Sequence, residues 1–142
     1  MKNISFFNKD KLILVIRIMF HTANLLLIIF YLFPGSILGC FVYDNCGKQP
    51  QLTSDFNIFS YILSSNHVYV FLVVSMLGFF SYIKKNYFLK VLIYLIFLSI
   101  VLELMHLIIP ERGFEIADLI GNILGVIMAT IIILISNVWR KK

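Results

Sequence analysis

Four long runs of apolar side chains dominate this chain of 142 residues. A helix of about 20 apolar residues is long enough to cross the hydrocarbon core of a bilayer. Three runs approach or exceed that length and one is shorter; in chain order they are Leu12–Phe33, His67–Ile83, Val91–Ile109 and Ile116–Ile135. Because backbone groups inside lipid must be hydrogen-bonded within the chain, the runs are predicted to be helices. We therefore predict an all-α protein, with residues 1–142 forming one integral membrane domain built as a four-helix transmembrane bundle.

The basic side chains predict how this bundle is oriented. Most of them lie near the N-terminus, between the second and third runs, or at the C-terminus, while the other two connections hold only Lys48 and Arg112. Positive residues collect on the cytoplasmic side of a membrane, so both termini are predicted to be cytoplasmic. The net charge of +5 is then explained by topology and by contact with anionic headgroups. Membrane lipid is therefore a predicted partner, and nucleic acid is not.

The long connection between the first two runs, Pro34–Asn66, is predicted to be extracytoplasmic. Its apolar part, Gly35–Tyr43, is predicted to lie at the membrane interface, and Asp55–Leu63 to form a short interfacial helix. We expect the connection to cover the outer mouth of the bundle, with a flexible loop as the alternative. The two cysteines of the chain, Cys40 and Cys46, both lie here. Because most extracytoplasmic compartments are oxidising, a disulfide is predicted, with two free thiols as the alternative.

The most polar stretch, Glu103–Gly125, lies across the third and fourth runs. A carboxylate in hydrocarbon is costly unless it is paired, protonated or facing water, so this stretch predicts a polar site. Helix spacing is expected to bring six polar side chains together in the outer third of the bundle: His67, Glu103, His106, Arg112, Asp118 and Asn122. Arg112 is predicted to pair with Glu103 or Asp118, or to contact an anion. The alternative is an ion-pair network that only joins the last two helices.

Two further sets of residues are predicted to join helices. One face of the first helix carries three polar side chains: Arg17, His21 and Asn24. Arg17 is expected to extend to the cytoplasmic surface, and His21 and Asn24 are interpreted as packing contacts, with a conduction path as the alternative. Small residues recur along one face of the last helix and would let another helix approach closely; they are Gly121, Gly125 and Ala129.

Metal chemistry is weakly indicated by spacing. Glu103-x-x-His106 resembles the motif of four-helix di-metal sites, but those sites need it twice, with two more carboxylates. It occurs once here, so no metal and no cofactor is predicted, although His67 and Asp118 are the side chains that would complete a mononuclear site. No nucleophile motif is recognised either, so no catalytic residue is assigned.

At these residues the sequence resembles the VanZ-like family of small polytopic bacterial membrane proteins. The family pattern is approximately E-x-x-Q, a short gap, P-x-R, and then D-x-x-x-N-x-x-G. The matching residues are Glu103, Pro110, Arg112, Asp118, Asn122 and Gly125, with His106 in place of the glutamine. The family also tends to begin an earlier helix with a histidine followed by aromatic residues, as His67–Phe71 does here. The resemblance covers about residues 66–136.

This resemblance implies a multi-pass protein of the bacterial inner membrane that acts at the cell envelope and affects glycopeptide susceptibility. It establishes no reaction. The preferred hypothesis is a non-enzymatic protein that binds or repositions an anionic or lipid-linked envelope precursor, with Arg112 as the anion contact. An intramembrane enzyme would instead use Glu103 or Asp118 as a general base and His67 or His106 as its acid–base partner. A structural subunit that binds another membrane protein is the third hypothesis.

Overall fold

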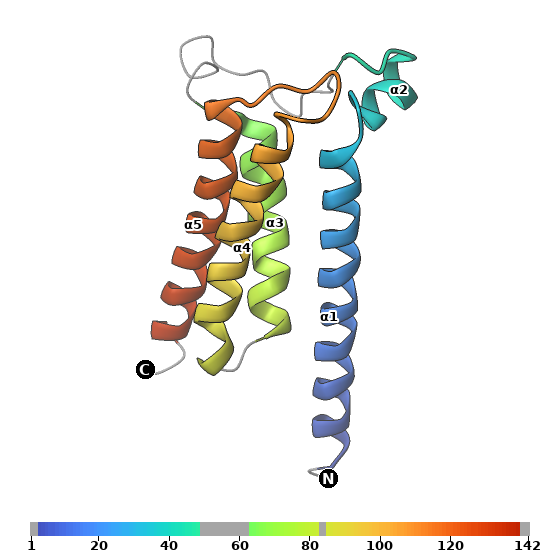
Figure 1. Ribbon diagram of the computed structural model, residues 1–142. Coiled ribbons are helices and arrows are strands. Elements are labelled where there is room, and N and C mark those ends of the chain that lie inside the picture. The colour runs from blue at the N-terminus through green and yellow to red at the C-terminus, as the bar shows by residue number, and fades with distance from the viewer. Residues whose placement is uncertain (1–2, 49–62, 83–84, 140–142) are drawn as a thin grey trace.

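The computed structural model describes residues 3–48, 63–82 and 85–139, and within these ranges the chain contains helices and no strands (Figure 1). The all-α prediction is confirmed. The described ranges hold five helices: α1 (Asn3–Leu32), α2 (Ile37–Tyr43), α3 (Ser65–Ser81), α4 (Lys85–Met105) and α5 (Ile116–Trp139). The interfacial helix predicted at Asp55–Leu63 falls outside the described residues, apart from Leu63.

Three of these helices contain segments long and apolar enough to cross a membrane. They are Asp10–Leu32 in α1, Asn86–Met105 in α4 and Ile116–Ser136 in α5. The apolar helix α3 has 17 residues, which is close to the lower limit of about 17 for a span perpendicular to the bilayer. Three candidate spans are therefore found among the described residues, and a fourth span through α3 stays a prediction.

The four long helices alternate in direction (Figure 1). α3 packs against α5, α4 and α1, and α4 also contacts α5 and α1. Both chain ends lie at one end of the molecule, called here the terminal end. The helix α2 and the segment that joins α4 to α5 lie at the other end, called here the loop end.

The interior and much of the exterior are both apolar. Phe71, Leu95 and Val126 are fully buried where the long helices meet. Large apolar side chains also face outward, including Phe97 and Ile131, which are 65% and 49% exposed. A helix that is apolar on all sides is typical of a membrane span.

Glycines on α5 allow it to lie close to α3. A Cβ atom added at Gly125 would lie 2.5 Å from the carbonyl oxygen of Val68, and one added at Gly121 would lie 2.7 Å from that of Ser64. Ala129, one turn further along α5, is fully buried. This close approach brings the first turn of α3 beside the first turns of α5, where the polar side chains of both helices lie.

The third apolar run ends as a helix earlier than predicted. We expected it to reach Ile109, but α4 ends at Met105. The chain then turns, with the backbone N–H of His106 donating to the carbonyl of Glu103 at 3.1 Å. Proline disfavours the helical conformation in the residue before it, so Pro110 explains why the helix does not continue. His106 therefore follows the helix instead of projecting from it.

Candidate functional site

Six polar side chains lie at the loop end and come from three helices and the segment between α4 and α5. We call them the polar cluster: His67, Glu103, His106, Arg112, Asp118 and Asn122. His67 lies in the first turn of α3, Glu103 in the last turn of α4, and Asp118 in the first turn of α5. Four members are buried, whereas Arg112 and Asp118 are partly exposed.

Tyr31, in the last turn of α1, lies at the centre of the polar cluster. Its hydroxyl donates a hydrogen bond to Asn122 Oδ1 at 2.8 Å and lies 3.1 Å from His67 Nδ1. Its ring stacks on that of His106, with 5.6 Å between ring centroids. The sequence did not indicate this residue as part of the site, because a tyrosine near the end of a membrane helix is typical of the interfacial aromatic belt. The only signal was its position at the same predicted level as the cluster.

His67 and Asp118 form one of two close pairs in the cluster, with 3.4 Å between Nε2 and Oδ2. The pair joins α3 to α5 where the glycines let those helices meet. Together with Glu103, these side chains place three potential metal-ligand atoms within 4.8 Å of one another.

Glu103 is fully buried and links the end of α4 to the start of α5. Its Oε1 accepts a hydrogen bond from the backbone N–H of Glu115 at 3.0 Å, just before α5. The first N–H groups of a helix lack partners within it and carry partial positive charge, which explains why the carboxylate lies there. The same oxygen is 3.4 Å from His106 Nδ1, while Glu103 Oε2 has no partner among the described residues.

The sequence predicted that Arg112 pairs with Glu103 or Asp118, and the structure contradicts this. Arg112 forms no ion pair within the described residues and instead donates to the carbonyls of Phe30 and Phe33, at 3.1 and 3.4 Å. The last carbonyls of a helix lack helical partners and form the negative end of its dipole, so the end of α1 attracts a cation. Burial lowers the pKa of Arg112, although a guanidinium keeps its charge at physiological pH.

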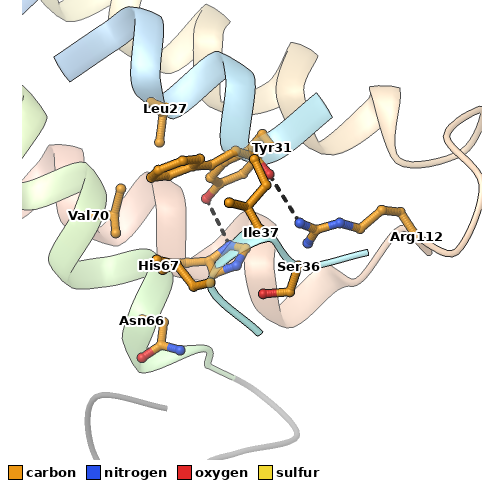
Figure 2. Close-up of a pocket in the computed structure, with 10 residues that line it drawn as sticks. Leu27, Tyr31, Ser36, Ile37, Asn66, His67, Val70 and Arg112 are labelled. Atoms are coloured by element: carbon orange, nitrogen blue, oxygen red, sulfur yellow. Dashed lines mark hydrogen bonds between the residues drawn. The ribbon is translucent and has the colours of Figure 1, made fainter. Parts of the chain in front are cut away.

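A cavity of about 140 Å³ opens beside the polar cluster (Figure 2). Apolar side chains of α1, α2 and α3 line one part of it. Polar side chains line the rest: Tyr31, Ser36, Asn66, His67 and Arg112. Figure 2 shows His67 and Arg112 reaching the same space from different parts of the chain. The carboxylate and amide members of the cluster, Glu103, Asp118 and Asn122, do not line this cavity.

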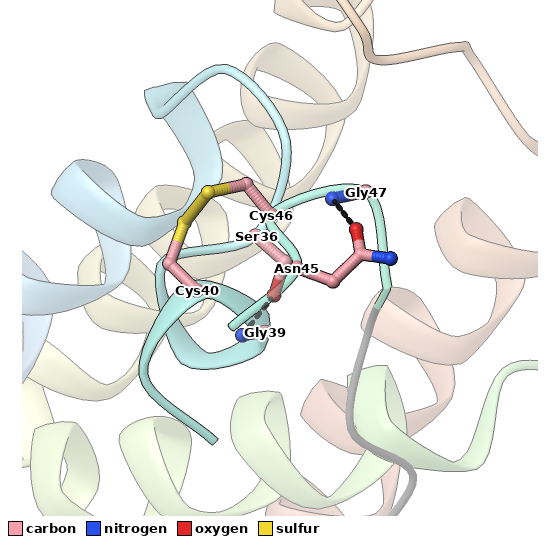
Figure 3. The surroundings of a disulfide bond; sticks show 6 residues. All are labelled: Ser36, Gly39, Cys40, Asn45, Cys46 and Gly47. Carbon is pink, nitrogen blue, oxygen red and sulfur yellow. Dashed lines mark hydrogen bonds between the residues drawn. A yellow bond between two sulfur atoms is a disulfide. The ribbon is translucent and has the colours of Figure 1, made fainter. Parts of the chain in front are cut away.

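The short helix α2 forms part of the cavity wall through Ile37 and Leu38. A disulfide links it to the residues that follow (Figure 3). The bond joins Cys40 to Cys46, as predicted from their shared loop. Ser36 stabilises the start of the helix, because its Oγ accepts a hydrogen bond from the backbone N–H of Gly39 at 3.0 Å. The disulfide therefore ties α2, which forms one wall of the cavity, to the turn that follows it.

Comparison with known proteins adds one match. The family model described as VanZ/LLP1 matches residues 2–137, nearly the whole chain. This range extends well beyond the residues 66–136 on which the sequence resemblance rests. No curated protein and no solved structure matches the chain.

Proposed function

The chain belongs to the VanZ/LLP1 family, and from that premise we propose a function for it. It is a multi-pass protein of the bacterial inner membrane that binds an anionic, lipid-linked component of the cell envelope. The binding site is the cavity beside the polar cluster, at the loop end, which faces away from the cytoplasm. Retention of such a component at the outer face is the route by which the protein affects glycopeptide susceptibility.

The bonding of Arg112 carries this proposal. Its guanidinium is held by the backbone carbonyls of Phe30 and Phe33, and no carboxylate of the described residues pairs with it. A guanidinium has more N–H donors than these two contacts use. Its positive charge is therefore not neutralised by a carboxylate partner, and its planar fork matches two oxygens of a phosphate.

The size and lining of the cavity support a phosphate-bearing lipid. Its volume of about 140 Å³ is similar to that of an apolar cavity of about 150 Å³ that binds benzene, so it suits a headgroup and not a whole lipid. Phe30 lines the cavity and is 38% exposed on the outside of α1. We place the exit of the lipid chain beside this side chain, where the cavity meets the apolar exterior.

A binding experiment tests the proposal. Purified protein in detergent is heated with a polyprenyl phosphate or with the corresponding uncharged polyprenol. We expect only the phosphate to raise the melting temperature, because a ligand that binds the folded state stabilises it. Arg112→Gln should abolish that increase.

Arg17→Gln is the matched control, because it removes the same charge at a side chain that stacks on Tyr82, away from the cavity. It should retain the increase. An equal increase with polyprenol, or a full increase in Arg112→Gln, would contradict the proposal.

A second candidate function is supported by the position of His67, which lines the cavity and also lies 3.4 Å from Asp118. A histidine next to both a carboxylate and a bound anion is suited to proton transfer. An enzyme would release inorganic phosphate from a polyprenyl diphosphate and lose this activity in His67→Gln. We expect no phosphate release from the wild-type protein.

The proposed orientation is tested by cysteine labelling in intact cells. A cysteine at Asn3, where α1 begins, should be protected from an impermeant maleimide if the terminal end is cytoplasmic. A cysteine at Glu111, which is exposed at the loop end, should be labelled. The reverse pattern would invert the topology and remove the cavity from the outer face.

A further inference from the structure

Three potential metal ligands converge from three different helices at the loop end. His67 of α3, Glu103 of α4 and Asp118 of α5 each offer one ligand atom within 4.8 Å of the others. Ligand atoms around a tetrahedral zinc ion lie about 3.4 Å apart, as follows from metal–ligand bonds of about 2.1 Å. His67 Nε2 and Asp118 Oδ2 are already separated by 3.4 Å. Two of the three ligand atoms are therefore spaced as a bound ion requires.

The hydrogen bonds of His67 leave its Nε2 free to bind a metal. The Tyr31 hydroxyl donates its proton to Asn122 Oδ1, so its oxygen accepts a hydrogen bond from His67 Nδ1. A neutral imidazole with its proton on Nδ1 has a lone pair on Nε2. That lone pair faces the carboxylate of Asp118, and a cation placed between them would attract both. A metal-binding histidine commonly donates its other N–H in this way, which orients the ring.

The two carboxylate oxygens of Glu103 also differ, because one is hydrogen-bonded and the other is not. Its Oε1 accepts from the backbone N–H of Glu115 and faces His106 Nδ1. Its Oε2 is buried and has no partner among the described residues. A buried carboxylate oxygen without a partner is unfavourable, and a metal ion would compensate it.

We propose that His67, Glu103 and Asp118 bind one divalent cation of the zinc class through one imidazole nitrogen and two carboxylates. Imidazole favours transition metals over Mg²⁺ and Ca²⁺, and three protein ligands leave a fourth position for water or substrate. The Glu103-x-x-His106 motif suggested His106 as a ligand. In the structure His106 Nδ1 instead lies 3.4 Å from Glu103 Oε1, and its Nε2 donates to the Tyr31 carbonyl at 3.1 Å. The histidine ligand comes from α3, which sequence spacing within one helix does not reveal.

The ion has a consequence for the charge of the cluster, and this consequence rests on the proposed function. With the histidines left out of the count, Glu103 and Asp118 together outweigh Arg112 by one negative charge, which opposes the binding of an anion. A divalent cation reverses this balance to one positive charge. The metal would thus make the loop end attractive to the phosphate of a lipid.

The experiment measures zinc binding directly. Tag-free protein treated with a chelator is dialysed against Zn²⁺ in detergent, and bound zinc is counted by elemental analysis. We expect about one zinc ion per chain, with no comparable retention of Mg²⁺. Asp118→Asn and His67→Gln should abolish this binding. Glu115→Gln and His21→Gln are matched controls that change an exposed carboxylate and a histidine outside the cluster, and both should bind zinc like the wild type.

A second variant keeps all three ligands and tests the orientation of His67. Tyr31→Phe removes the hydroxyl that holds Nδ1, and loss of such a partner weakens metal binding by roughly 10- to 100-fold. Wild-type zinc affinity in Tyr31→Phe, absence of zinc from the wild type, or full binding in Asp118→Asn would each overturn the proposal. Arg112→Gln should bind zinc normally while losing the response to polyprenyl phosphate. The metal site and the anion site can therefore fail separately.

Discussion

Two groups of histidine, tyrosine and asparagine side chains lie in this molecule, and they differ in how completely their polar atoms are satisfied. The first, called here the aromatic group, joins α1 to α3 and α4 nearer the terminal end and consists of His21, Asn24, Tyr82 and Tyr94. Tyr94 donates to Asn24 Oδ1 at 3.0 Å, and Asn24 Nδ2 donates to the Phe20 carbonyl at 2.9 Å. His21 Nε2 lies 3.0 Å from the Tyr82 hydroxyl. These contacts join α1 to α3 and α4, and His21, Tyr82 and Tyr94 also line a second cavity of about 290 Å³.

The polar cluster has the same three residue types around Tyr31 but adds carboxylates and unsatisfied atoms. Glu103 Oε2 and Asn122 Nδ2 are buried without a partner among the described residues. The third atom of this kind, Ser75 Oγ, belongs to neither group. Both groups lie next to a cavity, so the features that set the polar cluster apart are its carboxylates and its buried polar atoms without a partner, which call for an explanation.

The largest effect is expected from a substitution that separates α3 from α5 and so disrupts the polar cluster. Gly125→Val places a branched side chain against the backbone of Val68, where even a Cβ would lie 2.5 Å from the carbonyl oxygen. Because neighbouring backbone cannot rotate away, we expect a loss near the upper end for overpacking, roughly 3 kcal/mol. Thermal unfolding in detergent measures it, and zinc binding should fall with it. Gly113→Ala is the control, because a Cβ there meets nothing within 4 Å.

A smaller effect is expected at the wall of the cavity. Replacing Cys40 and Cys46 by serine should lower the free energy of unfolding of this segment by roughly 2 kcal/mol, since the bond closes a short loop. Ile37 and Leu38 of α2 line the cavity, so the melting-temperature increase with polyprenyl phosphate should shrink. Zinc binding should not change, because its ligands lie on α3, α4 and α5. An unchanged response to the lipid would show that α2 is not part of the binding site.

Much of the architecture was predictable from the sequence. The apolar runs identified the helices α1, α4 and α5, and two cysteines confined to one loop identified the disulfide. These features depend on local composition or on a pair close in sequence. The end of α4 at Met105 was missed, because the run stays apolar through Ile109 and periodicity alone does not register the effect of Pro110.

The arrangement of the cluster was less predictable because it depends on contacts between distant helices. The sequence placed Arg112 near two carboxylates, and opposite charges suggested a pair. It did not show that the end of α1 offers the carbonyls of Phe30 and Phe33 to the same guanidinium. Tyr31 was missed for the same reason, since its partners lie 36 and 91 residues away.

A double-mutant cycle tests which side chain Glu103 is coupled to. Glu103→Gln and His106→Gln change two groups 3.4 Å apart, and we expect a coupling of about 1 kcal/mol in thermal stability. The cycle that combines Glu103→Gln with Arg112→Gln should give a coupling within about 0.5 kcal/mol of zero, because Glu103 and Arg112 are not in direct contact. Glutamine is the residue that the resemblance described from the sequence places at position 106, so that variant is expected to fold. A larger coupling to Arg112 than to His106 would restore the ion pair predicted from the sequence.

A similarly small effect on stability is expected when one hydroxyl is removed from the aromatic group. Tyr94→Phe leaves Asn24 Oδ1 without its donor, which should cost about 1 kcal/mol in thermal stability. Tyr31→Phe is the matched change in the polar cluster, and its cost in stability should be similar because it also removes a hydroxyl bonded to an asparagine. The two variants should differ in binding. Zinc affinity should be unchanged in Tyr94→Phe and weakened in Tyr31→Phe, since only Tyr31 orients a proposed ligand. Equal zinc affinity in the two variants would mean that both tyrosines serve only to pack α1 against its neighbours, and the contrast between the two groups would then not extend to their tyrosines.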